Sequence, residues 1–219
     1  MRVAVLASGR GSNVQALLEA ISAGRCQAEI VGLIADRSSA GALDRMRSLG
    51  LPAVAIPMRR GESRARWDQR LLEASEALRP DLLVLAGFMR ILGPAFIERF
   101  RGRIINVHPS LLPAFPGAHA PADAIAAGVR ISGCTVHGVD EGVDTGPILA
   151  QAALAVLPGD DAASLHSRIQ RLEHTLLPAV IDWIGSGALE LGPPIRHHLT
   201  RFDDRAHLLC PHPESGSEP

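Results

Sequence analysis

The sequence predicts an α/β protein with a Rossmann-like, doubly wound, mostly parallel sheet. Short apolar runs of strand length alternate with segments in which apolar residues recur every three or four positions, the pattern of helices packed on a sheet. Residues 81–86 are apolar after the first position, as expected of a strand covered on both faces. The 219 residues are 47% hydrophobic and 21% charged, which permits a large core.

The first half of the chain predicts five strands joined by four helices. The expected strands are residues 3–7, 29–35, 53–56, 81–86 and 104–108. The expected helices are residues 13–23, 41–49, 63–78 and 94–100. Pro80 ends the third helix, and Pro94 suits the first turn of the fourth. Ligands of such sheets bind at the carboxyl ends of the strands, so we expect the loops after the first and fifth strands to share one cleft.

The second half predicts an antiparallel extension and a long helix. Residues 134–139 and 148–156 read as two strands joined by a hairpin-like loop, after a short helix over residues 121–127. Asp160 is the expected cap of a helix over residues 161–184.

The expected domain ends soon after that helix. Pro178 should interrupt the helix, because proline removes a backbone hydrogen bond. The pattern fades after Gly185, and residues 211–219 are rich in Pro, Ser and Glu, which predicts disorder. We therefore expect one domain over residues 1–190 and a C-terminal extension over residues 191–219.

Charge and cysteine usage exclude several classes of partner. The formal net charge of −1 gives no electrostatic grip on nucleic acid or on a membrane. The apolar run of residues 3–7 is too short for a signal peptide or a membrane span. The three cysteines, Cys26, Cys134 and Cys210, are far apart and favour a reducing compartment. We expect a cytoplasmic protein, either a monomer or a homodimer.

The strongest chemical signal is the pair Asn106 and His108. The two residues lie at i and i+2, hence on one side of a strand, where that strand enters a proline-rich loop. An amide can donate to a developing oxyanion, and an imidazole can move a proton. Asp144, in a Gly-containing acidic loop, could orient and charge the imidazole. The competing interpretation is a strand-end pair that satisfies loop backbone, with Asp144 in an ordinary polar hairpin loop.

Residues 8–13 follow the first strand and open a helix, which favours an anion site. Gly9 and Gly11 allow a tight turn, and the free N–H groups of the helix start attract a phosphate. A dinucleotide site would need a third glycine at Val14, although Asp36 could act as its ribose-binding acid. Monoester phosphate binding is the favoured hypothesis, and a purely structural turn stays open.

Other candidates have plain structural alternatives. His119 and His137 are as compatible with a structural role as with a site role. Gln170 and Glu173 share one face of the long helix, where most such pairs are exposed, and Arg64 opens a helix. The histidines and cysteines show no metal spacing, so we expect no metal. Cys134 lies inside a predicted strand, which argues against a nucleophile.

These motifs together resemble those of the glycinamide ribonucleotide formyltransferases, a folate-dependent family of purine synthesis. The resemblance covers roughly residues 1–185. It rests on residues 8–13, 85–92, 106–113, 116–119, 133–137, 144–147 and 170–174. It implies a formyltransferase type of fold and transfer of the formyl group of 10-formyltetrahydrofolate to the amine of glycinamide ribonucleotide.

The resemblance also implies residue roles. Asn106 would hold the formyl oxygen as it becomes an oxyanion, His108 would stabilise it and supply a proton, and Asp144 would pair with His108. The implied ribonucleotide-binding residues are Gly11, Ser12, Asn13, Gln170 and Glu173. The implied folate-binding residues are Arg64, Met89, Arg90, Ile91, Leu92, Asn106, Asp140, Glu141, Gly142, Val143 and Asp144. The apolar side chains of residues 89–92 suit a flat pterin, and Arg64 suits the folate carboxylates.

The chain departs from the family pattern after His119. Relatives commonly continue with a polar helix start, whereas this chain has Ala120-Pro121-Ala122-Asp123. A formyltetrahydrofolate hydrolase would use the same three groups on water but is expected to carry an extra N-terminal domain. A methionyl-tRNA formyltransferase is expected to carry a further domain and a basic surface. A sugar-nucleotide formyltransferase is the third alternative within the superfamily. From a different class, the alternatives are a non-catalytic folate- or nucleotide-binding protein and a nicotinamide-dependent oxidoreductase.

Overall fold

The computed structural model describes residues 1–192, 196–197 and 209–210. Its sheet has eight strands in the order β10-β7-β6-β5-β4-β1-β2-β3. The strands are β1 Arg2–Ala7, β2 Glu29–Ala35, β3 Ala53–Ala55, β4 Leu82–Leu85, β5 Ile104–His108, β6 Ile131–Gly138, β7 Ile148–Ala155 and β10 Leu209–Cys210. The helices are α1 Ser12–Ser22, α2 Gly41–Ser48, α3 Arg64–Ala77, α4 Pro94–Arg99, α5 Ala120–Ala126 and α6 Ala162–Gly185. A separate two-stranded sheet pairs β8 (Leu189–Glu190) with β9 (Arg196–His197).

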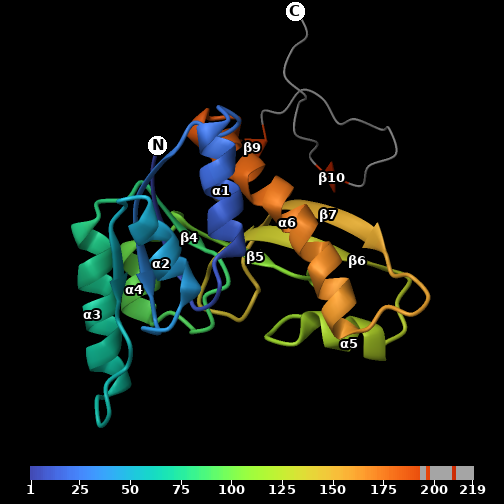
Figure 1. Cartoon of the computed structure of the whole chain (residues 1–219), viewed down its shortest axis with the longest axis horizontal. Helices are drawn as coiled ribbons and strands as arrows, with labels where there is room; N and C mark the ends of the chain where they lie inside the picture. The colour runs from blue at the N-terminus through green and yellow to red at the C-terminus, as the bar shows by residue number, and fades with distance from the viewer. Residues whose placement is uncertain (193–195, 198–208, 211–219) are drawn as a thin grey trace, which may run out of the picture.

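The parallel core and the antiparallel extension are both as predicted. Strands β1 to β5 pair in parallel, whereas β5–β6 and β6–β7 pair antiparallel. β2 and β5 occupy the same residues as the predicted strands. The ends of β1, β4 and β5 therefore lie at one edge of the sheet, where the two candidate loops begin (Figure 1).

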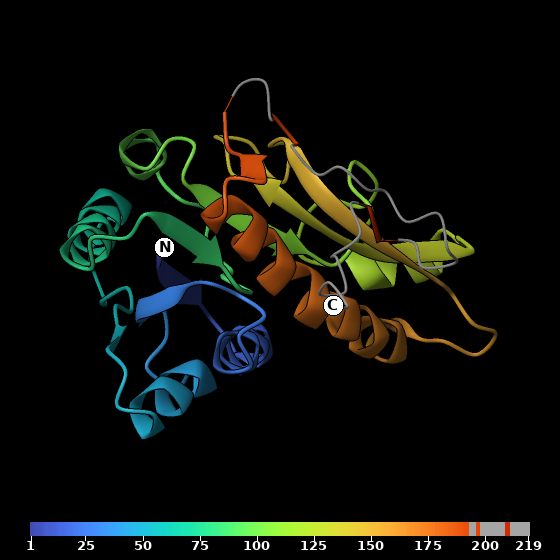
Figure 2. The same ribbon diagram turned by 90° about the horizontal axis from the view of Figure 1, so that it is seen from above.

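Helices cover both faces of the sheet, which explains its fully apolar strands. In β1, Val3 and Val5 pack in the cluster that contains the buried sides of α1 and α6, whereas Ala4 and Leu6 pack with α3 and α4. The four residues of β4 are all buried. Figure 2 shows α1 and α6 together on one side of the sheet, with α3 and α4 on the other.

The long helix corrects two predictions. Its cap is Asp161, because the Asp161 carboxylate accepts from Ser164 N (2.8 Å) while Ser164 Oγ accepts from Asp161 N (2.9 Å). Asp160 instead accepts hydrogen bonds from Leu157 N and Arg168.

The helix also runs through Pro178 without interruption. A proline inside a helix costs about 3 kcal/mol. The neighbouring residues in the core offset this cost: Leu176, Leu177, Val180 and Ile181 are all at most 1% exposed.

The C-terminal predictions reach beyond the part of the chain that the structure describes. The disorder expected of residues 211–219 lies outside the described residues, as does most of the 191–219 extension. The boundary near residue 190 stays a prediction. Among the described helices, none combines the length and apolar character that a membrane span requires.

Candidate active site

The catalytic candidates meet at the carboxyl end of β5. Asn106 and His108 lie on the same side of this strand, as their spacing predicts. Antiparallel pairing with β6 sets His137 opposite Asn106. His108 and His137 are only 5% and 2% exposed. The strand register therefore brings the Asn106 amide and the His108 imidazole together with a second imidazole, His137, which follows Asn106 by 31 residues in the chain.

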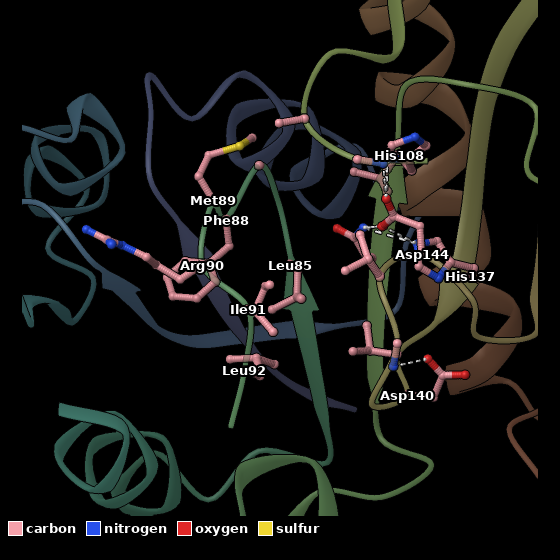
Figure 3. A pocket seen from close by; sticks show the side chains of 18 of the residues that line it. Leu85, Phe88, Met89, Arg90, Ile91, Leu92, His108, His137, Asp140 and Asp144 are labelled. Atoms are coloured by element: carbon pink, nitrogen blue, oxygen red, sulfur yellow. Dashed lines mark hydrogen bonds and ion pairs between the residues drawn. The ribbon is translucent and has the colours of Figure 1, made fainter. Parts of the chain in front are cut away.

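Asp144 enters this cluster from the loop between β6 and β7. Its backbone is left-handed, with φ at +55°, and this conformation turns the carboxylate back toward β5. Oδ2 accepts a hydrogen bond from Gly117 N at 2.8 Å and lies 3.3 Å from His108 Nδ1. Oδ1 lies 3.5 Å from Asn106 Nδ2 and 3.6 Å from His137 Nε2. Figure 3 shows the side chains of His108, His137 and Asp144 close together.

These partners keep Asp144 ionised. The His137 ring beside the carboxylate lowers the pKa of Asp144 most, and the Gly117 N–H and the two imidazole charges lower it further, against the opposite effect of burial. The resulting pKa is about 2. A permanent negative charge therefore faces His108 throughout the neutral range.

Both ring nitrogens of His108 face hydrogen-bond acceptors. Its Nε2 lies 2.9 Å from the carbonyl oxygen of Phe115, and its Nδ1 faces Asp144. Both neighbours are acceptors, so each ring nitrogen can use a proton. The Asp144 contact at 3.3 Å is longer than the common charge-assisted bond.

His137 holds the amide of Asn106 in place. The Nδ1 of His137 lies 2.7 Å from the Gly138 carbonyl oxygen, which assigns a proton to that nitrogen. When the ring is neutral, Nε2 accepts from Asn106 Nδ2, which lies 3.1 Å away. When the ring is charged, Nε2 faces Asp144 as a donor, and this form lowers the pKa of that carboxyl. With the neutral ring, one amide hydrogen of Asn106 is thus engaged, and the other has only the 3.5 Å contact with Asp144. That second hydrogen is held only by this long contact, so a ligand oxygen can compete for it.

The cluster forms one wall of a cleft of about 330 Å³. The facing wall is the segment between β4 and α4, in which Met89 and Ile91 are 61% and 62% exposed. Val143 is 51% exposed at the rim. Four more predicted folate-binding residues line the cleft: Arg90, Leu92, Asp140 and Gly142. Large exposed apolar side chains around a concave surface are typical of a ligand site.

The two predicted arginines are partly engaged elsewhere. The Arg90 side chain extends away from the cleft, as Figure 3 shows, and its Nε donates to Asp36 Oδ2 at 3.0 Å. Arg64 pairs with Asp68 at 2.7 Å and donates to the carbonyl oxygen of Ile91. Its side chain stays 45% exposed, so it remains open to an anion at the rim of the wall.

The predicted phosphate loop opens α1. Gly11 occupies the N-cap position with φ at +78°, and an added Cβ would lie 2.7 Å from Ala42 Cβ, so only glycine fits. In α1, Asn13 Nδ2 donates to Glu173 Oε2 of α6 at 2.8 Å. The loop and the long helix therefore meet, as the predicted ribonucleotide site requires.

Glu173 is an unusual residue of this second cluster. It is 4% exposed, and burial raises its pKa, against the opposing hydrogen bond from Asn13. Asn13 Oδ1 is buried without a hydrogen-bond partner among the described residues. Gln170 lies one turn before Glu173 on α6 and is partly buried. Buried polar atoms of this kind are ready to bind a polar ligand.

Two predicted candidates do not join either cluster. Glu141 is exposed, and it is absent from the residues that line the cleft. His119 is exposed at the N-cap of α5 and also lies outside the lining. The sequence reasoning missed two partners that the fold adds, namely Gly117 N and the Phe115 carbonyl, and it considered Asp36 only as a ribose-binding acid. Only Gly117 carried a signal, as part of the motif at residues 116–119.

Other chemistries find no support in the described part of the chain. No group of three or more His, Cys, Asp or Glu side chains could hold a metal among the described residues. Cys134 is fully buried, and burial raises its pKa, so its thiol is not activated.

The fold and the site define an α/β protein whose cleft carries an amide, an imidazole and a carboxylate, the groups that acyl transfer uses. The profile of the family described as formyl transferase matches residues 1–181. The chain belongs to this formyl transferase family.

Curated relatives extend the comparison along most of the chain. A phosphoribosylglycinamide formyltransferase of Mycobacterium tuberculosis is 48% identical over 180 residues, which are 82% of this chain and 83% of that protein. The Escherichia coli protein of the same name is 37% identical over 191 residues, 87% and 90% of the two chains. The trifunctional purine biosynthetic protein adenosine-3 of Drosophila pseudoobscura pseudoobscura is 48% identical over 190 residues, but this match spans only 14% of its length.

Solved structures agree with the sequence comparison. The crystal structure of glycinamide ribonucleotide transformylase 1 from Symbiobacterium toebii has a TM-score of 0.86 and 41% identity, covering 90% of this chain and 93% of that one. Phosphoribosylglycinamide formyltransferase from Bacillus halodurans has a TM-score of 0.82 and 40% identity, covering 86% and 97%. The formyltransferase type of fold predicted from the sequence is confirmed.

Proposed function

We propose that this protein transfers the formyl group of 10-formyltetrahydrofolate to the amine of 5'-phosphoribosylglycinamide, a step of purine biosynthesis. The observation that carries the proposal is the convergence of Asn106, His108 and Asp144 on one wall of a cleft whose other wall is apolar. The names of the relatives supply the acceptor and the reaction.

The proposed reaction is a direct attack without a covalent enzyme intermediate. The lone pair of the substrate amine forms a bond to the formyl carbon, and the carbonyl electron pair moves onto the oxygen. The bond from the formyl carbon to N10 of the folate then breaks. N10 takes up a proton, and the attacking nitrogen loses one.

Asn106 is the proposed oxyanion donor. His137 holds one hydrogen of its amide, so the amide plane is oriented before the substrate arrives. The second hydrogen can point at the formyl oxygen as negative charge develops there. A preorganised donor stabilises the transition state more than the ground state, which is the condition for faster turnover.

His108 is the proposed residue that stabilises the oxyanion by its charge, and His108 and Asp144 together are the proposed proton-transfer residues. The charged ring of His108 stabilises the oxyanion, and its Nδ1 proton can pass to N10, directly or through Asp144. Asp144 stays ionised because its pKa is about 2, so it can accept a proton only transiently from a strong acid such as the attacking ammonium. The Gly117 N–H keeps the carboxylate in position during this exchange.

Binding roles follow from the two clusters. We assign the phosphate to the N-terminal end of α1, at Gly11, Ser12 and Asn13, and the sugar or glycinamide groups to Gln170 and Glu173. We assign the pterin to the wall of residues 87–92 and to the loop of residues 140–144, with Arg64 near the folate carboxylates. Both substrates are small molecules, and the expected state of a monomer or homodimer remains a prediction.

The deciding experiment follows the loss of the formyl group spectroscopically. The purified protein is mixed with 10-formyltetrahydrofolate or 10-formyldideazafolate, with and without 5'-phosphoribosylglycinamide. The proposal expects deformylation only when the ribonucleotide is present. Equal deformylation without it would identify a hydrolase, and no deformylation in either mixture would reject both substrates.

A further inference from the structure

The folate wall is tied to the tips of two strands on its far side. Ser8 N donates to the Gly87 carbonyl oxygen at 3.1 Å, and Met89 N donates to Ser8 Oγ at 2.8 Å. Arg90 Nε donates to Asp36 Oδ2 at 3.0 Å. These contacts fix the start and the middle of the wall, and none of them is made by the catalytic cluster.

Asp36 is a buried charge that the proposed mechanism leaves unused. It follows β2 directly, and its side chain is 1% exposed. A carboxylate at this depth needs a cation, and Arg90, with a side chain 41% exposed, is the nearer of its two arginine neighbours. Arg37 Nε is 3.8 Å away. The Arg90 side chain extends away from the catalytic cluster (Figure 3), and its bond to Asp36 ties the wall to the residue that follows β2.

Ser8, at the start of the predicted phosphate loop of residues 8–13, forms two hydrogen bonds to the same wall. It follows β1 directly and precedes the glycines that open α1. It is 6% exposed, and both its backbone N–H and its hydroxyl are used on the wall. The hydroxyl accepts the N–H of Met89, a residue whose own side chain is exposed to the cleft.

We propose that Asp36 and Ser8 are positioning residues for the folate. They hold residues 87–92 in the shape that presents Met89 and Ile91 to the flat ring before it binds. A wall ordered in advance loses less conformational entropy on binding, so its ligand binds more tightly. The inference rests on the proposed function, because it assumes that this wall receives folate.

The first test replaces Asp36 by asparagine, which keeps the size and removes the charge. We expect the KM for the formyl-folate to rise about tenfold, which corresponds to the loss of one charge-assisted hydrogen bond. The kcat at saturating folate and the KM for the ribonucleotide should stay within about twofold, because the wall lies apart from the reacting atoms. A fall in kcat with an unchanged folate KM would overturn the inference.

A matched control separates positioning from a general loss of stability. Asp160 is also a deep carboxylate, with a side chain 7% exposed and 2.6 Å from Arg168. It lies just before α6 and does not line the cleft. Asp160→Asn should lower thermal stability without changing the folate KM. If Asp160→Asn raised the folate KM as much as Asp36→Asn, the specific role of Asp36 would be rejected.

A double-mutant cycle tests whether Asp36 acts through Arg90. Arg90→Gln alone should raise the folate KM by a similar factor, and the Asp36→Asn/Arg90→Gln double variant should be no worse than either single variant. Multiplication of the two effects would show that they act independently and would contradict the inference. Ser8→Ala should raise the folate KM several-fold, because Met89 N loses its partner.

Different results would reject the proposed function and the positioning roles of Asp36 and Ser8. If the wild-type protein shows no deformylation that depends on the ribonucleotide, the proposed function fails. If the wild type is active and the folded Asp36 and Ser8 variants keep the wild-type folate KM, only the positioning roles fail.

Discussion

The two walls of the cleft are built in opposite ways. In the catalytic cluster, polar side chains are buried and use one another as partners; His108 and His137 are 5% and 2% exposed. The folate wall leaves large apolar side chains in solvent; Met89 and Ile91 are 61% and 62% exposed. The polar groups of the catalytic cluster have partners without a ligand, whereas the apolar side chains of the folate wall stay exposed until a ligand covers them.

This difference separates chemistry from affinity. Groups that stabilise a transition state must be oriented before the reaction, and a closed hydrogen-bond network provides that orientation. Groups that bind a flat ring contribute mainly through the apolar area that binding removes from water. Substitutions in the cluster should therefore change kcat, and substitutions in the wall should change KM.

The largest effect is expected for Asn106→Ala. Removal of one oxyanion donor lowers turnover by about 10²–10³. The KM values should change little, and the melting temperature should stay near that of the wild type, since the side chain is only partly buried. Steady-state kinetics with both substrates saturating measures the change. Near-normal turnover in a folded Asn106→Ala protein would overturn the role.

The next largest effect concerns acid stability and Asp144. The folded pKa of about 2 lies below the ordinary 3.8, so the ionised carboxylate stabilises the fold above pH 4 and loses this effect as the pH falls through 2. The wild type should exceed Asp144→Asn by about 2 kcal/mol at neutral pH, with the gap closing near pH 2.

Urea unfolding from neutral to acid pH measures this gap. Glu141→Gln, at an exposed position of the same loop, is the control and should follow the wild-type profile. A gap between the wild type and Asp144→Asn that stayed constant with pH would show that the carboxylate charge is not the source of the stabilisation.

A smaller effect is expected on the apolar wall. Ile91→Ser should raise the folate KM about tenfold, because the ligand no longer covers an isoleucine side chain. The kcat should not change, and the free energy of unfolding should change by no more than about 0.5 kcal/mol, as for most exposed positions. Ile131→Ser is the matched control, since Ile131 is 55% exposed at the start of β6 and does not line the cleft.

The smallest effect is expected for Glu173→Gln, a substitution that tests how the charge of this buried residue changes the stability of the fold. Burial raises the pKa of Glu173, so its ionisation destabilises the fold above that raised pKa and has no effect below about pH 4. The variant should be slightly more stable than the wild type at pH 8 and equal to it at pH 4, while its KM for the ribonucleotide rises. Thermal melts at both pH values measure this. A loss of stability at pH 8 would contradict the assignment.

Local patterns predicted the strands and the core of the site because both depend on short-range geometry. The i, i+2 spacing of Asn106 and His108 places them on one side of any strand, and parallel topology brings strand ends together. The partners that complete the site come from pairings that spacing cannot reveal. Asp36 meets Arg90 across 54 residues, and Asn13 meets Glu173 across 160.

Tertiary packing reversed one local rule, and a local capping box decided between two possible caps. Proline disfavours a helix interior, but the apolar residues around Pro178 are buried, so the helix continues. Either Asp160 or Asp161 could cap α6 by residue type. The outcome was decided by Ser164, which completes a capping box with Asp161 and leaves Asp160 free to bind Arg168.

The contacts of Ser8 limit the substitutions that this chain can accept during evolution. One residue belongs to the loop assigned to the ribonucleotide and bonds twice to the wall assigned to the folate. A substitution of Ser8 would affect the binding of both ligands, whereas a substitution of Gln170 would affect only the binding of the ribonucleotide. A descendant that acquired a different acceptor could vary Gln170 freely, but it would have to keep Ser8 for as long as it kept the same formyl donor.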